Sequence, residues 1–261
     1  MKLLHKISAG ISIVSTLLIM QSCTKQNPKL VASQQTDFSN SSIVQVYMAA
    51  VGTISANVFV DAAQLTGATI ASGGVFPPGA GAVGANIQSG VRAFLVTTPT
   101  PLSFAENMQP SGAHTIFIYD TSNAPKQKTV PTLLEVPADT TARLRFANFV
   151  YSPFAIPAVD VFSKRRNAVI FSNVQITDVT GFIPYASGLT DTLYIRPTGT
   201  TTNLQNWVPP VAPATVGAFA DIRLITTPVA KRSYTVVFRG GWRASVSTNS
   251  TVRTLSIFTN Y

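Results

Sequence analysis

Hydrophobic positions along the chain come in short runs bounded by turn-forming residues. The runs are rich in Val, Ile, Phe and Tyr, and none keeps the i, i+3, i+4, i+7 spacing of a helix over a helix length. Gly, Pro, Ser, Thr and Asn separate them. The pattern therefore predicts an all-β protein, with strands within residues 43–48, 57–61, 91–96, 115–119, 143–148, 160–162, 193–195 and 233–238.

The second half of the pattern repeats the first half in the same order. Residues 143–148 correspond to 44–49, 160–162 to 57–59, 193–195 to 94–96, and 233–238 to 113–118. The repeat predicts two tandem β-sandwich domains, immunoglobulin-like or transthyretin-like, at residues 43–128 and 141–261. Pro131 and Pro137 punctuate a linker at 129–140. The competing arrangement is one continuous sandwich in which both halves share a core.

The second unit is longer than the first. The stretch from Gly188 to Thr235 is nearly twice the stretch from Gly90 to Thr115, and the surplus fits a Pro-rich loop insertion near 200–217. This loop carries Trp207, a candidate surface contact, because an aromatic residue on a long loop often binds a partner. The alternative is that Trp207 packs the loop onto the sandwich, since Trp is largely buried in most proteins.

The N-terminal segment has the layout of an export signal. Lys2 and Lys6 precede a short apolar stretch that ends near Ser22, and this stretch is too short and too rich in serine to span a bilayer. Residues 1–22 are therefore expected to be a lipoprotein signal peptide. Residues 23–42 begin with Cys23, the only cysteine, and continue as a polar tether without periodicity.

Composition restricts how the fold is held together and what it binds. The chain is 46% hydrophobic and 11% charged, which excludes a disordered chain. With no second cysteine, no internal disulfide can form, and too few Cys and His residues exist for a structural zinc site. The net charge of +9 suits anionic neighbours such as lipid head groups or acidic polysaccharide, but the charges are scattered and no nucleic-acid surface is expected.

One run of basic residues and one histidine are the remaining candidates for chemistry. Lys164, Arg165 and Arg166 form the only tight basic run, either an anion contact or a solvated turn. His114 lies in a strand pattern, with no Gly-x-Ser-x-Gly motif elsewhere to supply a nucleophile. Asp160 is expected on the outer face of its strand by alternation with two valines. No catalytic residue, metal site or cofactor is expected, although a pair of acids could still meet in space.

Two resemblances extend this interpretation. Met20-Gln21-Ser22-Cys23 resembles the lipobox of Bacteroidota-type lipoproteins, which implies lipidation of Cys23 and attachment to a membrane. Residues 142–162, ARLRFANFVYSPFAIPAVDVF, resemble the opening of the uncharacterised family domain of unknown function 4397, and residues 194–200 and 233–240 resemble its later strands. The first half resembles the family only at 57–61 and 115–119. The resemblance implies a small β-sandwich of the cell envelope and brings no catalytic residue with it.

These observations favour a non-catalytic, lipid-anchored cell-envelope protein that binds an envelope partner or serves as a structural module. The alternative is a glycan-binding module or a cryptic glycan hydrolase of a polysaccharide-utilisation system. The expected location is the outer membrane. Surface-exported lipoproteins of the group that the lipobox resembles tend to carry acidic residues just after the cysteine. Residues 24–29 contain two lysines and no acid, so the resemblance implies the periplasmic face and leaves the outer face open.

Overall fold

The computed structural model describes residues 39–52, 55–79, 83–132, 136–209, 216–247 and 251–260. Every regular element in this part of the chain is a β-strand, which confirms the all-β prediction. The predicted signal peptide, Cys23 and most of the predicted tether lie outside the described residues. Within those that are described, no helix is long and apolar enough to cross a membrane.

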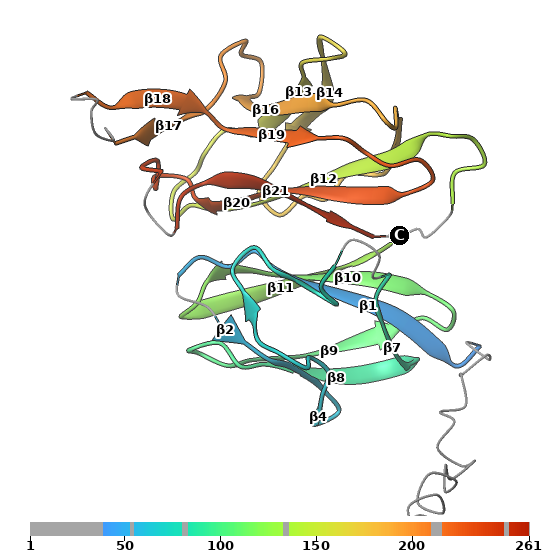
Figure 1. Ribbon diagram of the computed structural model, residues 1–261. Helices are drawn as coiled ribbons and strands as arrows, with labels where there is room; N and C mark the ends of the chain where they lie inside the picture. The colour runs from blue at the N-terminus through green and yellow to red at the C-terminus, as the bar shows by residue number, and fades with distance from the viewer. Residues whose placement is uncertain are drawn as a thin grey trace, which may run out of the picture. The chain divides into compact units, whose positions relative to one another are not determined.

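The first half, residues 39–132, contains two larger sheets (Figure 1). Its inner sheet has the order β11-β10-β1-β6, with β7 also pairing with β1: β1 (Ser41–Met48), β6 (Val75–Phe76), β7 (Ala85–Gln88), β10 (Ala113–Thr121) and β11 (Ala124–Pro131). Its outer sheet has the order β4-β3-β8-β9: β3 (Val58–Val60), β4 (Ala63–Gln64), β8 (Gly90–Val96) and β9 (Leu102–Met108). A small pair joins β2 (Ser55–Ala56) to β5 (Ile70–Ala71).

The second half, residues 136–260, repeats this arrangement. Its inner sheet has the order β15-β12-β20-β21: β12 (Ala142–Tyr151), β15 (Ile183–Tyr185), β20 (Ser233–Gly241) and β21 (Thr254–Thr259). Its outer sheet has the order β14-β13-β16-β19: β13 (Val159–Ser163), β14 (Ala168–Val174), β16 (Asp191–Pro197) and β19 (Arg223–Thr226). The stretch predicted as a Pro-rich loop contributes β17 (Gln205–Val208), which pairs with β18 (Ala218–Asp221).

Strand register shows which positions of the two halves correspond. In both inner sheets the first strand pairs in parallel with the fourth strand of the predicted repeat, β1 with β10 and β12 with β20. Gln45 lies opposite Thr115, and Arg145 lies opposite Thr235. With 233–238 aligned on 113–118, residue 143 therefore corresponds to residue 43. The predicted alignment of 143 with 44 was wrong by one residue, which exchanges the two faces of the strand.

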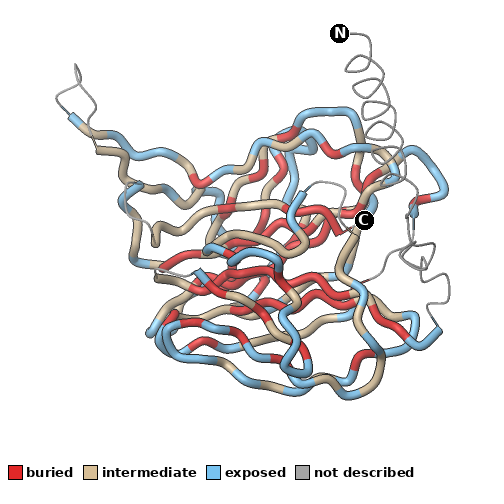
Figure 2. The backbone as a smooth tube through the Cα atoms, turned by 60° about the horizontal axis from the view of Figure 1, so that its bottom comes forward, coloured by how far each residue is buried: buried red, intermediate tan, exposed pale blue. Residues whose placement is uncertain are grey.

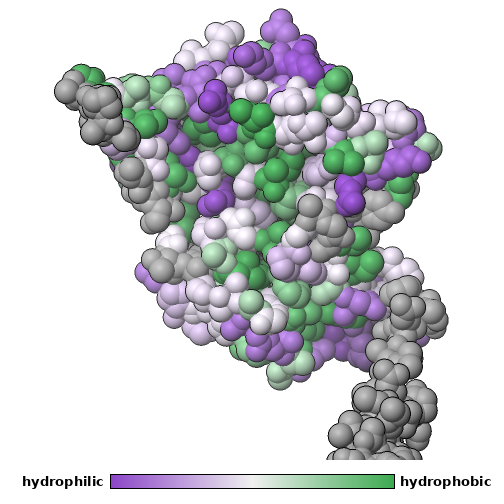
Figure 3. Space-filling view, in the orientation of Figure 1, coloured by the Kyte–Doolittle hydropathy of each residue, from purple (hydrophilic) through white to green (hydrophobic). Residues whose placement is uncertain are grey.

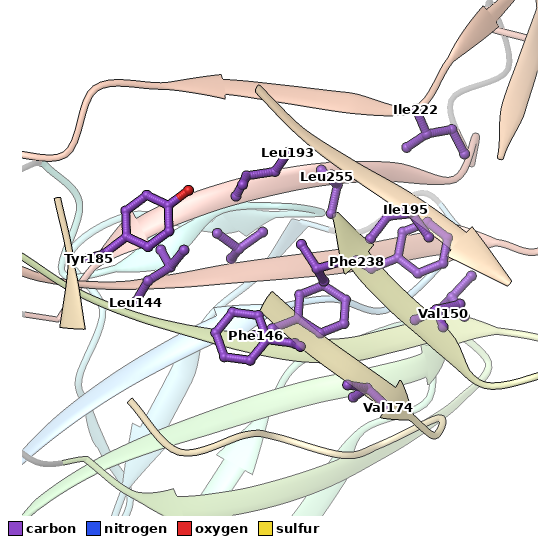
Figure 4. Packing of buried hydrophobic residues seen from close by; sticks show 14 residues of the cluster. Leu144, Phe146, Val150, Val174, Tyr185, Leu193, Ile195, Ile222, Phe238 and Leu255 are labelled. Atoms are coloured by element: carbon purple, nitrogen blue, oxygen red, sulfur yellow. The ribbon is translucent and has the colours of Figure 1, made fainter. Parts of the chain in front are cut away.

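Each half has its own hydrophobic core between its inner and outer sheets. The first core contains Val44 and Val46 of β1 against Val58 and Phe94 of the outer sheet. The second contains Leu144, Phe146 and Val150 of β12 against residues of β13 and β16, as Figure 4 shows. Both cores draw on alternate residues of the inner strands, as a strand with two distinct faces requires.

A third hydrophobic cluster lies between the two inner sheets. It contains Tyr47, Phe117 and Ala49 from the first half and Phe149 and Phe258 from the second, together with Ala147 and Val237. The rings of Phe117 and Phe149 stack with centroids 4.5 Å apart. The central strands of the inner sheets, β1, β10, β12 and β20, are thus buried on both faces. Figure 2 shows the buried segments concentrated in the middle of the molecule. Burial on both faces explains why β1 and β12 read as apolar runs with little alternation.

Candidate functional site

The end of the second half at which β12 and β20 terminate gathers apolar side chains, exposed or half-buried, from three separate segments of the chain. We call this surface the aromatic loop end, and it consists of Phe154, Trp207, Val216, Phe219 and Val246. Phe219 is 66% exposed and Val216 is 76% exposed, so both present apolar surface to solvent. In Figure 3, hydrophobic surface is visible over β18 at this end of the molecule.

Trp207 is half-buried and joins two of these loops. On β17 it lies opposite Phe219 of β18, and the two rings meet edge to face with centroids 5.2 Å apart. The backbone N–H of Trp207 donates to the carbonyl of Ser245 over 2.6 Å, and its backbone carbonyl accepts the N–H of Ser247 over 2.8 Å. A side chain at Gly217 would collide with the indole ring. Trp207 therefore packs its hairpin against the segment after β20 and also contributes to the exposed surface.

Arg253 fixes the base of the β17–β18 hairpin. Its Nη2 donates to the carbonyl of Gln205 over 2.7 Å, and its Nε donates to Oδ1 of Asn206 over 3.2 Å. Asp221 accepts from the side chains of Asn203 and Gln205 over 2.8 and 2.9 Å. These charge-assisted bonds hold the hairpin in one position, so the exposed aromatic residues stand on a fixed support.

Phe154 and Arg243 extend the surface from a neighbouring loop. Phe154 is 55% exposed, and the guanidinium of Arg243 lies 4.2 Å from its ring centroid. Arg243 is two residues before Ser245, which bonds to Trp207. A cation over an aromatic face stabilises both groups and leaves one side of the ring open.

Sequence reasoning identified Trp207 but missed Phe154, Val216 and Phe219. Ala218-Phe219-Ala220-Asp221 contains a single large apolar residue between two alanines, which gives no amphipathic signal. The signal that did exist was the Pro-rich composition of the loop, which marked its position without marking its contact residues.

The basic run forms the turn between β13 and β14. Lys164, Arg165 and Arg166 are all exposed. The guanidinium groups of Arg165 and Arg166 lie over the ring of Tyr185, at 5.7 and 4.5 Å from its centroid. Arg166 also donates to the carbonyl of Pro184 over 3.0 Å. Two of the three cations are thus held against one aromatic ring, and the turn as an anion contact stays a prediction.

Asp191, at the start of β16, lies beneath this turn and is buried. It accepts the hydroxyl of Ser163 over 2.5 Å, the hydroxyl of Tyr185, and the N–H groups of Arg165 and Thr192 over 2.9 and 2.6 Å. Burial raises the pKa of Asp191, but these hydrogen bonds outweigh burial and hold the pKa below its ordinary value. Burial, and then the bond to Asp191, raise the pKa of Tyr185 to about 12. The cluster anchors the turn in one geometry.

The structure does not bring the two predicted contact regions together. Lys164 bonds through its N–H to Thr192, near the start of β16. Leu204, just before β17, bonds to Ile195 near the other end of β16. Trp207 and the basic turn therefore lie toward opposite ends of the second outer sheet, and Cys23 lies outside the described residues.

Asp160 was predicted on the outer face of its strand, and it does lie outside the core that Val159 and Val161 enter, but it is not exposed to solvent. Val159 and Val161 are buried as expected, but Asp160 is only 6% exposed. Its carboxylate accepts the N–H groups of Asn173 and Gly199 over 2.7 and 3.2 Å and the hydroxyl of Thr198 over 2.8 Å. The β-bulge between β13 and β14 gives the side chain backbone donors that simple alternation does not foresee.

His114 is a buried sheet residue, as its strand pattern suggested. Its Nε2 accepts the N–H of Gln109 over 3.3 Å. Burial lowers the pKa of His114, against a smaller opposite effect of Glu106. The imidazole is therefore neutral at pH 7, with one nitrogen occupied by the backbone.

The described carboxylates all take part in hydrogen bonds or ion pairs of the fold. Besides Asp160 and Asp191, these are Asp61 with Arg92, Glu106 with Gln127, Asp120 with Lys126, Asp139 with Thr141, Asp178 with Gln175, and Asp221 with Asn203. Within the described residues, no group of three or more His, Cys, Asp or Glu side chains could hold a metal ion.

Comparison with known proteins adds no relative to this picture. No protein-family model matches the chain, and no curated protein matches it either.

Proposed function

We propose that the chain is a non-catalytic, lipid-anchored protein of the cell envelope that binds a partner protein through the aromatic loop end. In this proposal its two halves are β-sandwich domains of the type of domain of unknown function 4397, and Cys23 carries the lipid. The outer membrane, facing the periplasm, is the proposed location. No cofactor or metal takes part.

The observation that carries the binding role is the exposure of Val216 and Phe219 on a hairpin whose base is fixed. Large apolar side chains presented on a rigid support lose little conformational freedom on binding, and they gain by leaving water. Aromatic residues surrounded by polar groups are typical centres of protein interfaces.

Glycan binding through the same surface is the second candidate, and the exposed aromatic side chains favour it. Sugar-binding platforms present a ring face to the sugar. Here the planes of Trp207 and Phe219 meet at 64°, so the two rings form no common flat platform. This angle favours a protein partner. Hydrolysis of a glycan would further require two carboxylates free to react, whereas Asp160 and Asp191 are both occupied by several donors.

The anchoring proposal is tested by replacing Cys23. Metabolic labelling with a fatty-acid analogue is expected to label the wild-type protein and to pellet it with membranes, because two or more acyl chains hold a protein stably. Cys23→Ala is expected to lose both the label and the membrane fractionation. If the Cys23→Ala protein still pellets with membranes, anchoring through this residue is wrong.

The binding proposal is tested by photo-crosslinking in cells. A photoreactive amino acid at position 219 is expected to give a discrete crosslinked protein, and the additional change Val216→Ser is expected to weaken it. The matched control places the same group at Val91, which is equally exposed at 69% but lies on β8 of the first half. Equal crosslinking from positions 91 and 219, or crosslinking to polysaccharide only, would contradict a protein partner at the aromatic loop end.

A further inference from the structure

Two clefts open where the two inner sheets meet. The larger cleft, of about 620 Å³, is lined by His114, Thr132 and Ser111 of the first half and by Arg143, Arg145 and Phe182 of the second. The smaller cleft, of about 390 Å³, is lined by Val75 and Gly79 of the first half and by Tyr234, Phe258 and Thr259 of the second. We call them the arginine cleft and the neutral cleft.

The two clefts occupy corresponding places in the internal repeat. The paired residues His114 and Pro131 line the arginine cleft. Their counterparts in the repeat, the paired residues Tyr234 and Thr259, line the neutral cleft, so these two walls correspond. Gln45 corresponds to Arg145, because they lie opposite Thr115 and Thr235. The neutral cleft therefore shows how the same junction is built without an arginine.

Gln45 and Arg145 make corresponding bonds across the junction. Gln45 donates from Nε2 to the carbonyl of Thr259 over 2.9 Å, and Arg145 reaches the corresponding carbonyl of Pro131 from Nη1 over 3.4 Å. Asn260 donates to Oε1 of Gln45 over 2.9 Å. A neutral side chain is thus sufficient to connect the halves at this position.

Arg145 is a buried cation whose described partners are all neutral. It is 3% exposed, and it donates to the hydroxyls of Thr235, Thr115 and Thr132 over 2.8, 3.0 and 3.2 Å. Its guanidinium also lies 4.6 Å from the ring centroid of Phe182. No salt bridge to Arg145 is present among the described residues. Burial lowers the pKa of Arg145 to about 9, so it is still charged at pH 7.

A buried charge without an opposite charge is unfavourable, and the fold does not require one here, because Gln45 makes the corresponding bond across the junction with a neutral side chain. Arg143, which also lines the arginine cleft, adds a second positive charge nearby, and this charge also interacts with the carboxylate of Asp139. We propose that the arginine cleft binds a carboxylate-bearing ligand, with Arg145 at its floor and Arg143 at its side providing the positive charge.

The remaining walls of the arginine cleft suggest a hydroxylated acid. Ser111, Thr132 and Thr180 place hydroxyl groups at the wall, and Phe182 supplies an apolar surface. The hydroxyls of Thr132 and Thr180 also bond within the fold, to Thr115 and to Gly181, so they can still accept a hydrogen bond from a ligand. The volume falls in the range of small-molecule sites. A uronic acid combines a carboxylate with several hydroxyls and is therefore a suitable probe. The proposal does not depend on the aromatic loop end, which consists of other residues.

The test is isothermal titration of the full-length protein in non-ionic detergent with glucuronate, with glucose and with inorganic phosphate. Glucuronate is expected to bind and glucose is not. Arg145→Gln, which introduces the side chain that the first half has at the corresponding position 45, is expected to weaken glucuronate binding about tenfold or more. Arg143→Gln, at a less buried position, is expected to do the same, so that the test does not rest on one variant. Arg223→Gln removes the same charge from an exposed strand and serves as the control for net charge.

Several results would overturn the proposal. These are no heat with glucuronate, equal binding of glucose, binding of phosphate alone, or unchanged glucuronate binding in both arginine variants with intact thermal unfolding. Glu135 lies outside the described residues and follows Thr132, a partner of Arg145, by three positions in the chain. Glucuronate binding that appears only in Glu135→Gln would show that the chain itself supplies the carboxylate, and would exclude an external ligand.

Discussion

In the first half, Arg92 of β8 forms an ion pair with Asp61, with 2.8 Å between Nη1 and Oδ2, and the Asp61 side chain is 45% exposed. In the second half, the position that corresponds to Arg92 is occupied by Asp191, which is buried beneath Ser163 and Tyr185. The same turn of the same repeat is thus held by a solvent-exposed ion pair in one half and by a buried carboxylate in the other. Since exposed ion pairs contribute little to stability, the second outer sheet should be the more firmly held of the two.

The largest effect is expected from separating the halves. Residues 141–260 expressed alone retain their own core but expose Phe149, Val237 and Phe258, which the first half covers in the whole chain. We expect a cooperative melt, a lowered melting temperature and self-association through the uncovered face. Circular dichroism and analytical ultracentrifugation measure these properties. An unfolded fragment would mean that both halves depend on a shared core, and a monomer that melts like the whole chain would mean that the junction contributes nothing.

The next largest effect is expected at the centre of the junction. Phe117 has no exposed surface and contacts the rings of Tyr47, Phe149 and Phe258. Phe117→Ala is expected to lower the free energy of unfolding by about 3–5 kcal/mol, from lost burial and the cavity left behind. A double-mutant cycle with Phe149→Ala in chemical denaturation should show coupling, because the two rings touch. Additive effects would show that the halves are not energetically joined there.

The buried carboxylate gives a smaller effect that contrasts the halves directly. Asp191→Asn replaces a charged acceptor of four hydrogen bonds and is expected to cost about 1–3 kcal/mol of unfolding free energy. Asp61→Asn, at the exposed ion pair, is expected to cost less. Equal losses in denaturant melts would contradict the distinction between the two turns.

This contrast also depends on pH. Because the pKa of Asp191 is lowered in the folded state, its contribution is present above the unfolded value of about 3.8 and is lost as pH falls through the folded value. Acid unfolding of wild type should therefore show a loss of stability at low pH that is diminished in Asp191→Asn.

The smallest effects are expected at one turn that both halves share. The N–H of Gly73 bonds to the carbonyl of Met48, and that of Thr177 bonds to the carbonyl of Asn148, each over 2.6 Å. Both residues have a positive φ, 82° and 70°. Gly73→Ala is expected to destabilise the protein by about 1–2 kcal/mol for two reasons. The added methyl group would collide with the guanidinium of Arg239, and alanine is strained at this positive φ.

Thr177→Gly, the reciprocal change, is expected to be neutral or to stabilise by up to about 1 kcal/mol, because a β-branched residue is strained at positive φ. Thermal melts of the two variants measure both changes. A destabilising Thr177→Gly would show that the threonine side chain contributes contacts that outweigh its strain.

The sequence predicted the strands well because each is a short apolar run with clear ends. Residues 43–48 and 233–238 fall within β1 and β20, and 94–96 correspond to 193–195 as the register of β8 and β16 confirms. The correspondence of β1 with β12 was missed by one residue because both strands are apolar on both faces. Without alternation, a pattern comparison cannot tell one face from the other.

The junction between the halves was not predicted, although the sequence contained a signal for it. Gln45 and Arg145 each interrupt a long apolar run, and a polar residue inside a run that is buried on both faces needs a buried partner. Their partners, such as Asn260 and Thr132, are distant in sequence and carry no mark of their own. Only the packing of one sheet on the other brings them together.

The parallel pairing within each inner sheet also bears on whether the two halves could be joined in the opposite order along the chain. Because Ile43 lies beside Ala113, and His114 beside Pro131, the first half starts and finishes at the same end of its inner-sheet strands. The second half does the same, and Asn260 reaches Gln45 of β1. A circular permutant that begins at residue 142 and joins residue 260 to residue 41 through a short flexible bridge would retain every strand pair. A permutant that folds with these pairs would show that the fold does not depend on which half is synthesised first.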